Sequence, residues 1–183
     1  MNNQLPTISW QKLTKKCIVW GLWLLVLTIF QTSFFSVFKV FGMTPNLVLP
    51  AVVTAAIYDR ERSAVITGLT GGFLIDALGS FGLSLSPLTY MLFGIAAALL
   101  TFSVMNRSFA SFAILTSIFL IIDGIIGIFA SRAVIKNPSA GFGKLIGELV
   151  FPQFLASLLV GIAVYLLTKL IWSRLFDNRE MEG

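Results

Sequence analysis

Three acidic side chains lie inside or beside long apolar stretches of this sequence: Asp76, Asp123 and Glu148. An isolated charge at the centre of a bilayer costs about 2.5–3.5 kcal/mol, so each carboxylate is expected to be neutral, paired, hydrated or close to a membrane interface. Asp76 is the one charged residue between Ser63 and Asn106. These acids are suited to recognition of a neighbouring helix, because a carboxylate accepts hydrogen bonds from the backbone or polar groups of that helix.

Each of these acids has a structural interpretation that competes with recognition. Glu148 follows Lys144 by four residues, the spacing of an ion pair on one helix face at the membrane interface. Asp123 is followed by Gly124 and Gly127, where another helix can approach closely. Asp123 is therefore a candidate either for packing within the chain or for contact with a partner.

Asp76 ends a row of small residues. Gly68, Gly72 and Asp76 are spaced i, i+4 and i+8, which places them along one face of a helix. Glycines allow a second helix to come close, so this face favours helix-to-helix recognition, either with a partner or within one bundle. As an alternative, Asp76 caps a break at Gly79–Gly82 by accepting backbone N–H bonds.

The residue types that most catalytic sites require are missing from this chain. It contains no histidine and one cysteine, Cys17, which excludes histidine-activated nucleophiles, the two-histidine zinc protease motif and a histidine proton relay. It also lacks a phosphate-binding glycine loop, a His/Cys metal cluster and paired acids suited to magnesium. We predict a protein that is not an enzyme and needs no cofactor or metal.

Hydropathy divides the chain into six apolar stretches that must position these acids. Hydrophobic residues make up 57% of the chain and charged residues 11%, more apolar surface than a soluble domain of 183 residues can bury. The sequence therefore predicts an all-α polytopic membrane protein with about six transmembrane helices. The expected spans are about Ile18–Phe38, Val40–Tyr58, Ser63–Leu78, Leu85–Met105, Phe109–Ser131 and Ile146–Trp172.

The second and third spans are expected to be short or broken. Pro45 and Pro50 interrupt the second span, and the third is short. A spanning helix with a break, or a re-entrant hairpin packed inside the protein, fits such a pattern. The whole chain forms one predicted membrane domain, in which residues 1–16 are a cytoplasmic tail, residues 17–172 the bundle and residues 173–183 a second cytoplasmic tail.

The distribution of basic residues predicts that both termini lie in the cytoplasm. With six crossings, nine Lys and Arg residues fall on the side of the termini and four on the other side. The formal net charge of +5 does not indicate nucleic-acid binding, because these residues are spread over the membrane ends, next to the headgroups of the lipid bilayer.

Several segments, taken in order, resemble the family of the rod-shape-determining protein MreD. The densest is the glycine-rich stretch that ends in Asp76, followed by a short loop and the start of the next span. Similar residues precede and follow it. The segments are Pro45-Asn46-Leu47, Gly68-Leu69-Thr70-Gly71-Gly72-Phe73-Leu74-Ile75-Asp76, Gly82-Leu83, Leu88-Thr89-Tyr90, Asn106-Arg107 before the span carrying Asp123, and Phe151-Pro152.

The resemblance implies a scaffold of the bacterial cell-elongation machinery in the cytoplasmic membrane. Such a protein binds the bitopic protein MreC and helps to couple MreB filaments to the RodA glycosyltransferase with its class B penicillin-binding protein. Under this hypothesis the face of Gly68, Gly72 and Asp76, or the face of Asp123, receives a partner helix. Pro45 and Asn46 are further candidate partner-binding or structural residues.

A second hypothesis is the substrate-binding subunit of an energy-coupling-factor vitamin transporter, whose six-helix architecture is similar to that of the MreD family. Such subunits dock to their coupling protein through an Ala-x-x-x-Ala surface on the first helix. The stretch Ile18–Phe38 contains no alanine, although a stripe of Thr28, Thr32 and Ser36 can take its place. The scaffold hypothesis is therefore preferred.

Overall fold

The computed structural model describes residues 10–58, 61–79, 85–103, 108–134, 143 and 146–175, and these residues are almost entirely helical. Four helical stretches are long and apolar enough to cross a membrane, and two apolar helices, α2 and α3, are shorter. The prediction of an all-α polytopic membrane protein with a short second and third helix is confirmed. The elements are α1 (Trp10–Val37), α2 (Val48–Tyr58), α3 (Glu61–Gly79), α4 (Ser86–Ser103), α5 (Phe109–Val134), the π-helical turn η1 (Ile146–Val150) and α7 (Phe151–Leu175).

The first and last helices are longer than the predicted spans. α1 begins at Trp10, inside the predicted tail of residues 1–16, and α7 continues to Leu175. Both extensions include Lys or Arg, which favour helix, so the helices do not stop where the apolar stretch stops. The break at residues 80–82, the pair Asn106-Arg107, the turn at residues 59–60, Lys144 and the tail after residue 175 lie outside the described residues.

The second predicted span, Val40–Tyr58, is broken in its early part as expected, because only Val48–Tyr58 is helical. Val40 and Met43 instead form a tight turn, with N···O distances of 2.9 and 3.0 Å between their backbones. Phe41 and Gly42 at its tip have φ angles of 53° and 79°, as a two-residue turn of this kind requires. The chain then enters the bundle in a non-helical conformation, since a proline disfavours helix at the residue before it.

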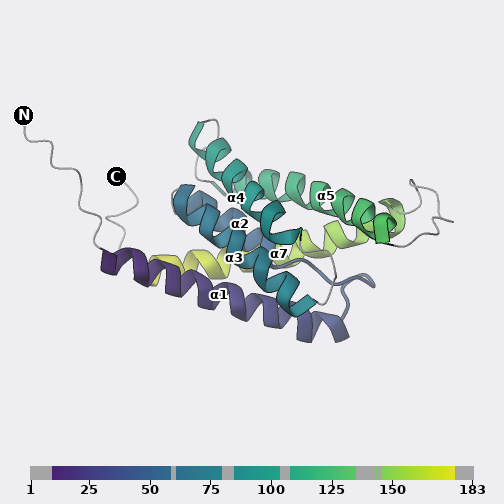
Figure 1. Cartoon of the computed structure of the whole chain (residues 1–183), viewed down its shortest axis with the longest axis horizontal. Helices are drawn as coiled ribbons and strands as arrows, with labels where there is room; N and C mark the ends of the chain where they lie inside the picture. Colours follow the sequence, from purple (N-terminus) through teal and green to yellow (C-terminus); the bar gives the residue numbers. More distant parts are fainter. Residues whose placement is uncertain are drawn as a thin grey trace, which may run out of the picture.

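α2 lies at the centre of the bundle, where Figure 1 shows it enclosed by the other helices. Every residue from Val48 to Ile57 is buried, and α2 contacts α1, α3, α4, α5 and α7. The second apolar stretch is therefore non-helical in its first half and helical in its second. Within the non-helical stretch, Pro45, Asn46 and Leu47 are buried, whereas Phe41 at the tip of the turn is 62% exposed.

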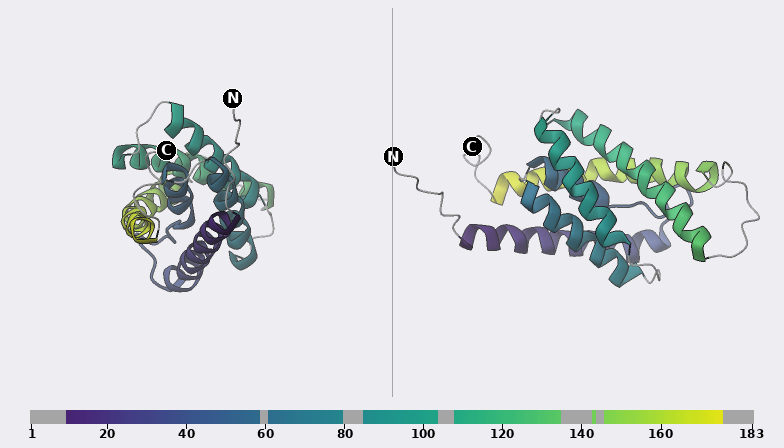
Figure 2. Two further views of the ribbon diagram at one scale, coloured as in Figure 1. Left: turned by 90° about the vertical axis from the view of Figure 1, so that its left-hand side faces the viewer. Right: turned by 45° about the horizontal axis from the view of Figure 1, so that its top comes forward.

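The start of α1 and the end of α7 lie at the same end of the bundle, as the right-hand view in Figure 2 shows. α3 begins at this end, and α2 also ends there. This arrangement is compatible with the expected placement of both termini on one side of the membrane. That this side is the cytoplasmic side stays a prediction.

The glycine face of α3 is covered by α4 of the same chain. A Cβ atom built on Gly68 would overlap the backbone carbonyl of Tyr90, and one built on Gly72 would lie 2.5 Å from the Cα atom of Pro87. On the facing helix, a Cβ atom at Gly94 would overlap the carbonyl of Ala64. Gly68 and Gly72 thus serve a close approach of α3 and α4 within the bundle.

Candidate functional site

Asn46 lies two residues before α2 and satisfies the backbone of its first turn. Its Oδ1 atom accepts a hydrogen bond from the N–H of Leu49 at 3.1 Å, the geometry of an N-cap. The first N–H groups of a helix have no partner inside it, and a buried helix cannot leave them to water. Asn46 is 4% exposed, so this cap is formed inside the protein.

Two other helices supply acceptors to the same turn. Gln31 of α1 accepts the N–H of Leu47 through its Oε1 atom at 2.8 Å. Ser157 of α7 accepts the N–H of Asn46 through its hydroxyl oxygen, also at 2.8 Å. The start of the half-helix is therefore fastened by side chains from α1 and α7 in addition to its own cap.

The side-chain amide of Asn46 joins α2 to α4 and α5. Its Nδ2 group donates to the Oδ2 atom of Asp123 at 3.1 Å and also to the hydroxyl oxygen of Tyr90. The Tyr90 hydroxyl in turn donates to the same Asp123 oxygen at 3.5 Å, a long contact. We call Asn46, Tyr90 and Asp123 the polar cluster.

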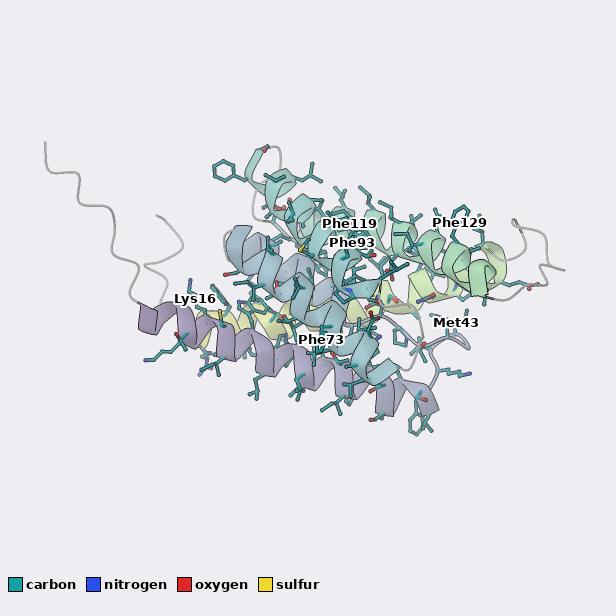
Figure 3. All side chains as sticks on the ribbon, in the orientation of Figure 1. Lys16, Met43, Phe73, Phe93, Phe119 and Phe129 are labelled. Carbon is teal, nitrogen blue, oxygen red and sulfur yellow. The ribbon has the colours of Figure 1, made fainter. Side chains whose placement is uncertain are left out.

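The surroundings of Asp123 are polar on one side and aromatic on the other. Asp123 is half-buried beside the N-terminal end of α2, where the helix dipole carries partial positive charge. A stack of Phe93 on α4 and Phe119 on α5, with ring centroids 4.9 Å apart, packs one turn away from Tyr90 and Asp123 (Figure 3). The cluster thus combines two hydrogen-bond donors and a helix terminus around a single acid.

Asp76 lies in the last turn of α3 and is not part of this cluster. Its Oδ2 atom is buried and has no hydrogen-bond partner in the part of the chain that the structure describes. Asp76 follows Gly72 by one helical turn, and Gly72 packs against the backbone of Ser86 and Pro87 at the start of α4. A buried acceptor without a donor costs about 1–3 kcal/mol, which makes Asp76 a position that a donor from outside would stabilise.

The structure brings some of the predicted residues together and separates others. Asn46, with Pro45 directly before it, and Asp123 meet in the polar cluster. Gly68 and Gly72 lie in the contact between α3 and α4 and outside the polar cluster. Gly68 nevertheless touches the backbone of Tyr90, a member of that cluster. Asp76 stays apart, and the alternative that it caps a break at residues 80–82 falls outside the described residues.

Three participants were not selected as site residues from the sequence. Tyr90 belongs to one of the segments that resemble the MreD family, and neither Gln31 nor Ser157 is a predicted site residue. Each is a side chain with hydrogen-bonding atoms inside an apolar stretch, which is the signal that could have identified it. Because serine and threonine often bond to their own helix, this signal is weakest for Ser157.

The chemical capacity of this arrangement is hydrogen bonding between helices. No group of three or more His, Cys, Asp or Glu side chains suited to a metal ion occurs within the described ranges. Comparison with known proteins finds no match, whether to a family model, a curated protein or a solved structure. The assignment to the MreD family therefore stays a prediction.

Replacing Tyr90 by Phe is expected to lower the free energy of unfolding by about 1 kcal/mol, because Asp123 keeps its bond from Asn46. Unfolding of the purified protein by SDS in mixed micelles measures this loss. The Tyr90→Phe and Asp123→Asn effects should not be additive, since both residues share one hydrogen-bond network. The matched control is Tyr165→Phe, whose hydroxyl pairs with that of Tyr58 at 2.9 Å, and its effect should add to that of Asp123→Asn. If Tyr90→Phe and Tyr165→Phe were both additive with Asp123→Asn, Tyr90 would not belong to the hydrogen-bond network of Asp123.

Proposed function

We propose that this chain is a non-enzymatic membrane scaffold of the bacterial cell-elongation machinery, similar to MreD. In this proposal it resides in the cytoplasmic membrane with both termini in the cytoplasm. It binds an MreC-like bitopic protein and a RodA-like glycosyltransferase with its class B penicillin-binding protein, and through them connects indirectly to MreB filaments.

One observation carries the proposal: segments that resemble the MreD family in separate parts of the sequence meet in a single cluster. Asn46 belongs to the Pro45-Asn46-Leu47 segment, Tyr90 ends the Leu88-Thr89-Tyr90 segment, and Asp123 lies in the fifth apolar stretch. Their side chains are joined by hydrogen bonds around Asn46. Residues that jointly hold a fold are the ones that a family sharing this fold would have in common, so their convergence supports the resemblance.

Asp76 is the position at which we expect a partner to bind. The glycines of its face are already covered by α4, which leaves the carboxylate at the end of that face with an unmet acceptor. A backbone or side-chain donor from a partner helix would satisfy it. Because the Asp76 Oδ2 atom has no partner among the described residues, its loss should affect partner binding more than folding.

Replacing Asp76 by Ala should reduce recovery of the partners by about tenfold or more, since a hydrogen bond to a charged group contributes about 1.5–3 kcal/mol. The tagged full-length protein is extracted mildly from its native membrane, and enriched proteins are identified by mass spectrometry against an unrelated polytopic control. Asp76→Asn keeps an acceptor of the same shape and serves as the matched variant. The position is ruled out if Asp76→Ala recovers the same partners at the wild-type level.

The polar cluster also leaves the transporter hypothesis open as a second candidate. A small solute can be recognised where several helices bring hydrogen-bonding side chains together inside a bundle. The same extraction separates the two functions. Recovery of an MreC-like or RodA-like protein supports the scaffold, whereas recovery of paired ATPases with a membrane coupling protein supports the transporter subunit.

A further inference from the structure

The turn formed by Val40 and Met43 holds Phe41 in a left-handed backbone conformation. Phe41 has a φ angle of 53°, and Gly42 has one of 79°. In this conformation the Cβ atom of an L-residue comes too close to the following carbonyl oxygen, so asparagine or glycine usually occupies the first position of such a turn. A phenylalanine there therefore carries backbone strain that asparagine or glycine would largely avoid.

The ring of Phe41 gains little from the rest of the chain to offset this strain. The residue is 62% exposed, and its ring stacks on no other aromatic ring of the described residues. By contrast, Phe35 on the last turns of α1 is 8% exposed and packs in the core. Contacts that offset the strain at Phe41 therefore have to come from outside the chain.

The turn lies at the level where the first span leaves the membrane. The apolar stretch of α1 ends at Val37, and Val37 and Phe38 are 75% and 62% exposed. The next residue, Lys39, is exposed, and a lysine at the end of a span extends its ammonium group toward the lipid headgroups. Figure 3 places Met43 toward the same end of the bundle. Phe41, two residues after Lys39, is therefore close to the depth of the headgroups.

The turn offers apolar surface and no excess of positive charge. Asp76 in the last turn of α3 and Glu148 in η1 also lie toward this end of the bundle, so one lysine does not make it an anion-binding surface. The exposed side chains of Val37, Phe38 and Phe41 instead extend the apolar stretch of α1 beyond its last turn. The environment that suits them is the apolar layer directly beneath the headgroups.

We propose that this turn is a membrane anchor, which inserts the ring of Phe41 into the apolar layer beneath the lipid headgroups at this end of the bundle. Transfer of the ring from water into that layer offsets the strain in the backbone. The anchor sets the depth at which the chain turns back toward the buried start of α2. This inference is independent of the proposed scaffold function, because it requires no partner protein.

Spin labelling of the full-length protein in vesicles of palmitoyloleoylphosphatidylcholine tests the anchor. A nitroxide is attached through Thr44→Cys in a Cys17→Ser background, because Thr44 is exposed directly after the turn and Cys17 is the only cysteine. Collisions with water-soluble nickel ethylenediaminediacetate report the hydration of the label. Phe41→Asn should raise the nickel collision rate severalfold, because asparagine suits the positive φ angle and has no ring to insert.

Two further variants show whether the ring itself is responsible. Phe41→Trp keeps a ring that favours the membrane interface and should give the wild-type collision rate. The matched control is Phe102→Asn, which removes an 87% exposed ring from the last turn of α4 and should leave the label unaffected. The circular dichroism spectrum of Phe41→Asn should match that of the wild type, which tells loss of the anchor apart from loss of the fold.

An unchanged nickel collision rate in Phe41→Asn would overturn the proposal. So would a label that is as accessible to nickel with Phe41 in place as a nitroxide free in water, or an equal increase in Phe102→Asn. A label that is shielded from nickel in native membranes but accessible in the pure lipid would assign the ring to a protein partner instead.

Discussion

The Asn46→Asp variant is expected to unfold about 2–4 kcal/mol more easily than the wild type, the largest effect of a single polar substitution in this protein. The new carboxylate keeps an oxygen that caps Leu49 but replaces the Nδ2 donor that now lies 3.1 Å from Asp123. Two carboxylate oxygens would then face each other without the donor between them. Unfolding by SDS in mixed micelles, followed by circular dichroism, measures the change.

The exchange of the two groups provides the sharpest control. In the double variant N46D/D123N, the amide moves to α5 and the carboxylate to α2, so that one donor and one acceptor again face each other. We expect this variant to recover at least half of the stability lost in Asn46→Asp, whereas independent sites would give the sum of the two single effects. Additivity of the two substitutions would contradict the direct hydrogen bond between Asn46 and Asp123.

The sequence predicts the number of apolar helices and most of their positions, because long apolar stretches in a membrane protein have few alternatives to helix. It indicates a break in the second span but not what satisfies the backbone there. Hydropathy measures whether a segment leaves water. It does not predict whether the backbone of that segment forms hydrogen bonds within its own helix. Here the first turn of α2 receives bonds from Gln31 and Ser157 instead, and these partners lie 16 and 111 residues away in the sequence.

The sequence predicts individual residues of the candidate site but not the contacts between them. Asp123 stands out as an acid inside an apolar stretch, and Asn46 as part of a segment interrupted by prolines. That the two meet depends on the central position of α2, which follows from packing among five helices. Nothing in the spacing of 77 residues between Asn46 and Asp123 indicates their contact.

The glycine face of α3 shows a related limit. A row of small residues predicts that some helix comes close, and this expectation holds. Which helix comes close depends on how the chain turns after Gly79. The spacing of the small residues does not predict that turn. The structure assigns the face to α4, and this links the glycines to the polar cluster, because Gly68 lies against the backbone of Tyr90.

Gly72→Ala is therefore expected to lower the free energy of unfolding by about 1–3 kcal/mol, even though a single methyl group is added. The new Cβ atom would lie 2.5 Å from the Cα atom of Pro87 and closer still to the carbonyl of Ser86. Both are backbone atoms, so the helices must separate to accommodate it. SDS unfolding compares the variant with the wild type.

Gly127→Ala is the matched control, because a Cβ atom at that position has nothing within 4 Å and the substitution gains helix propensity. It should be as stable as the wild type or up to about 1 kcal/mol more stable. Separation of α3 from α4 would also shift Tyr90, so Gly72→Ala should reduce the further loss caused by Tyr90→Phe. Wild-type stability of Gly72→Ala would show that α3 and α4 do not approach this closely, and the glycine face would again be available to a partner helix.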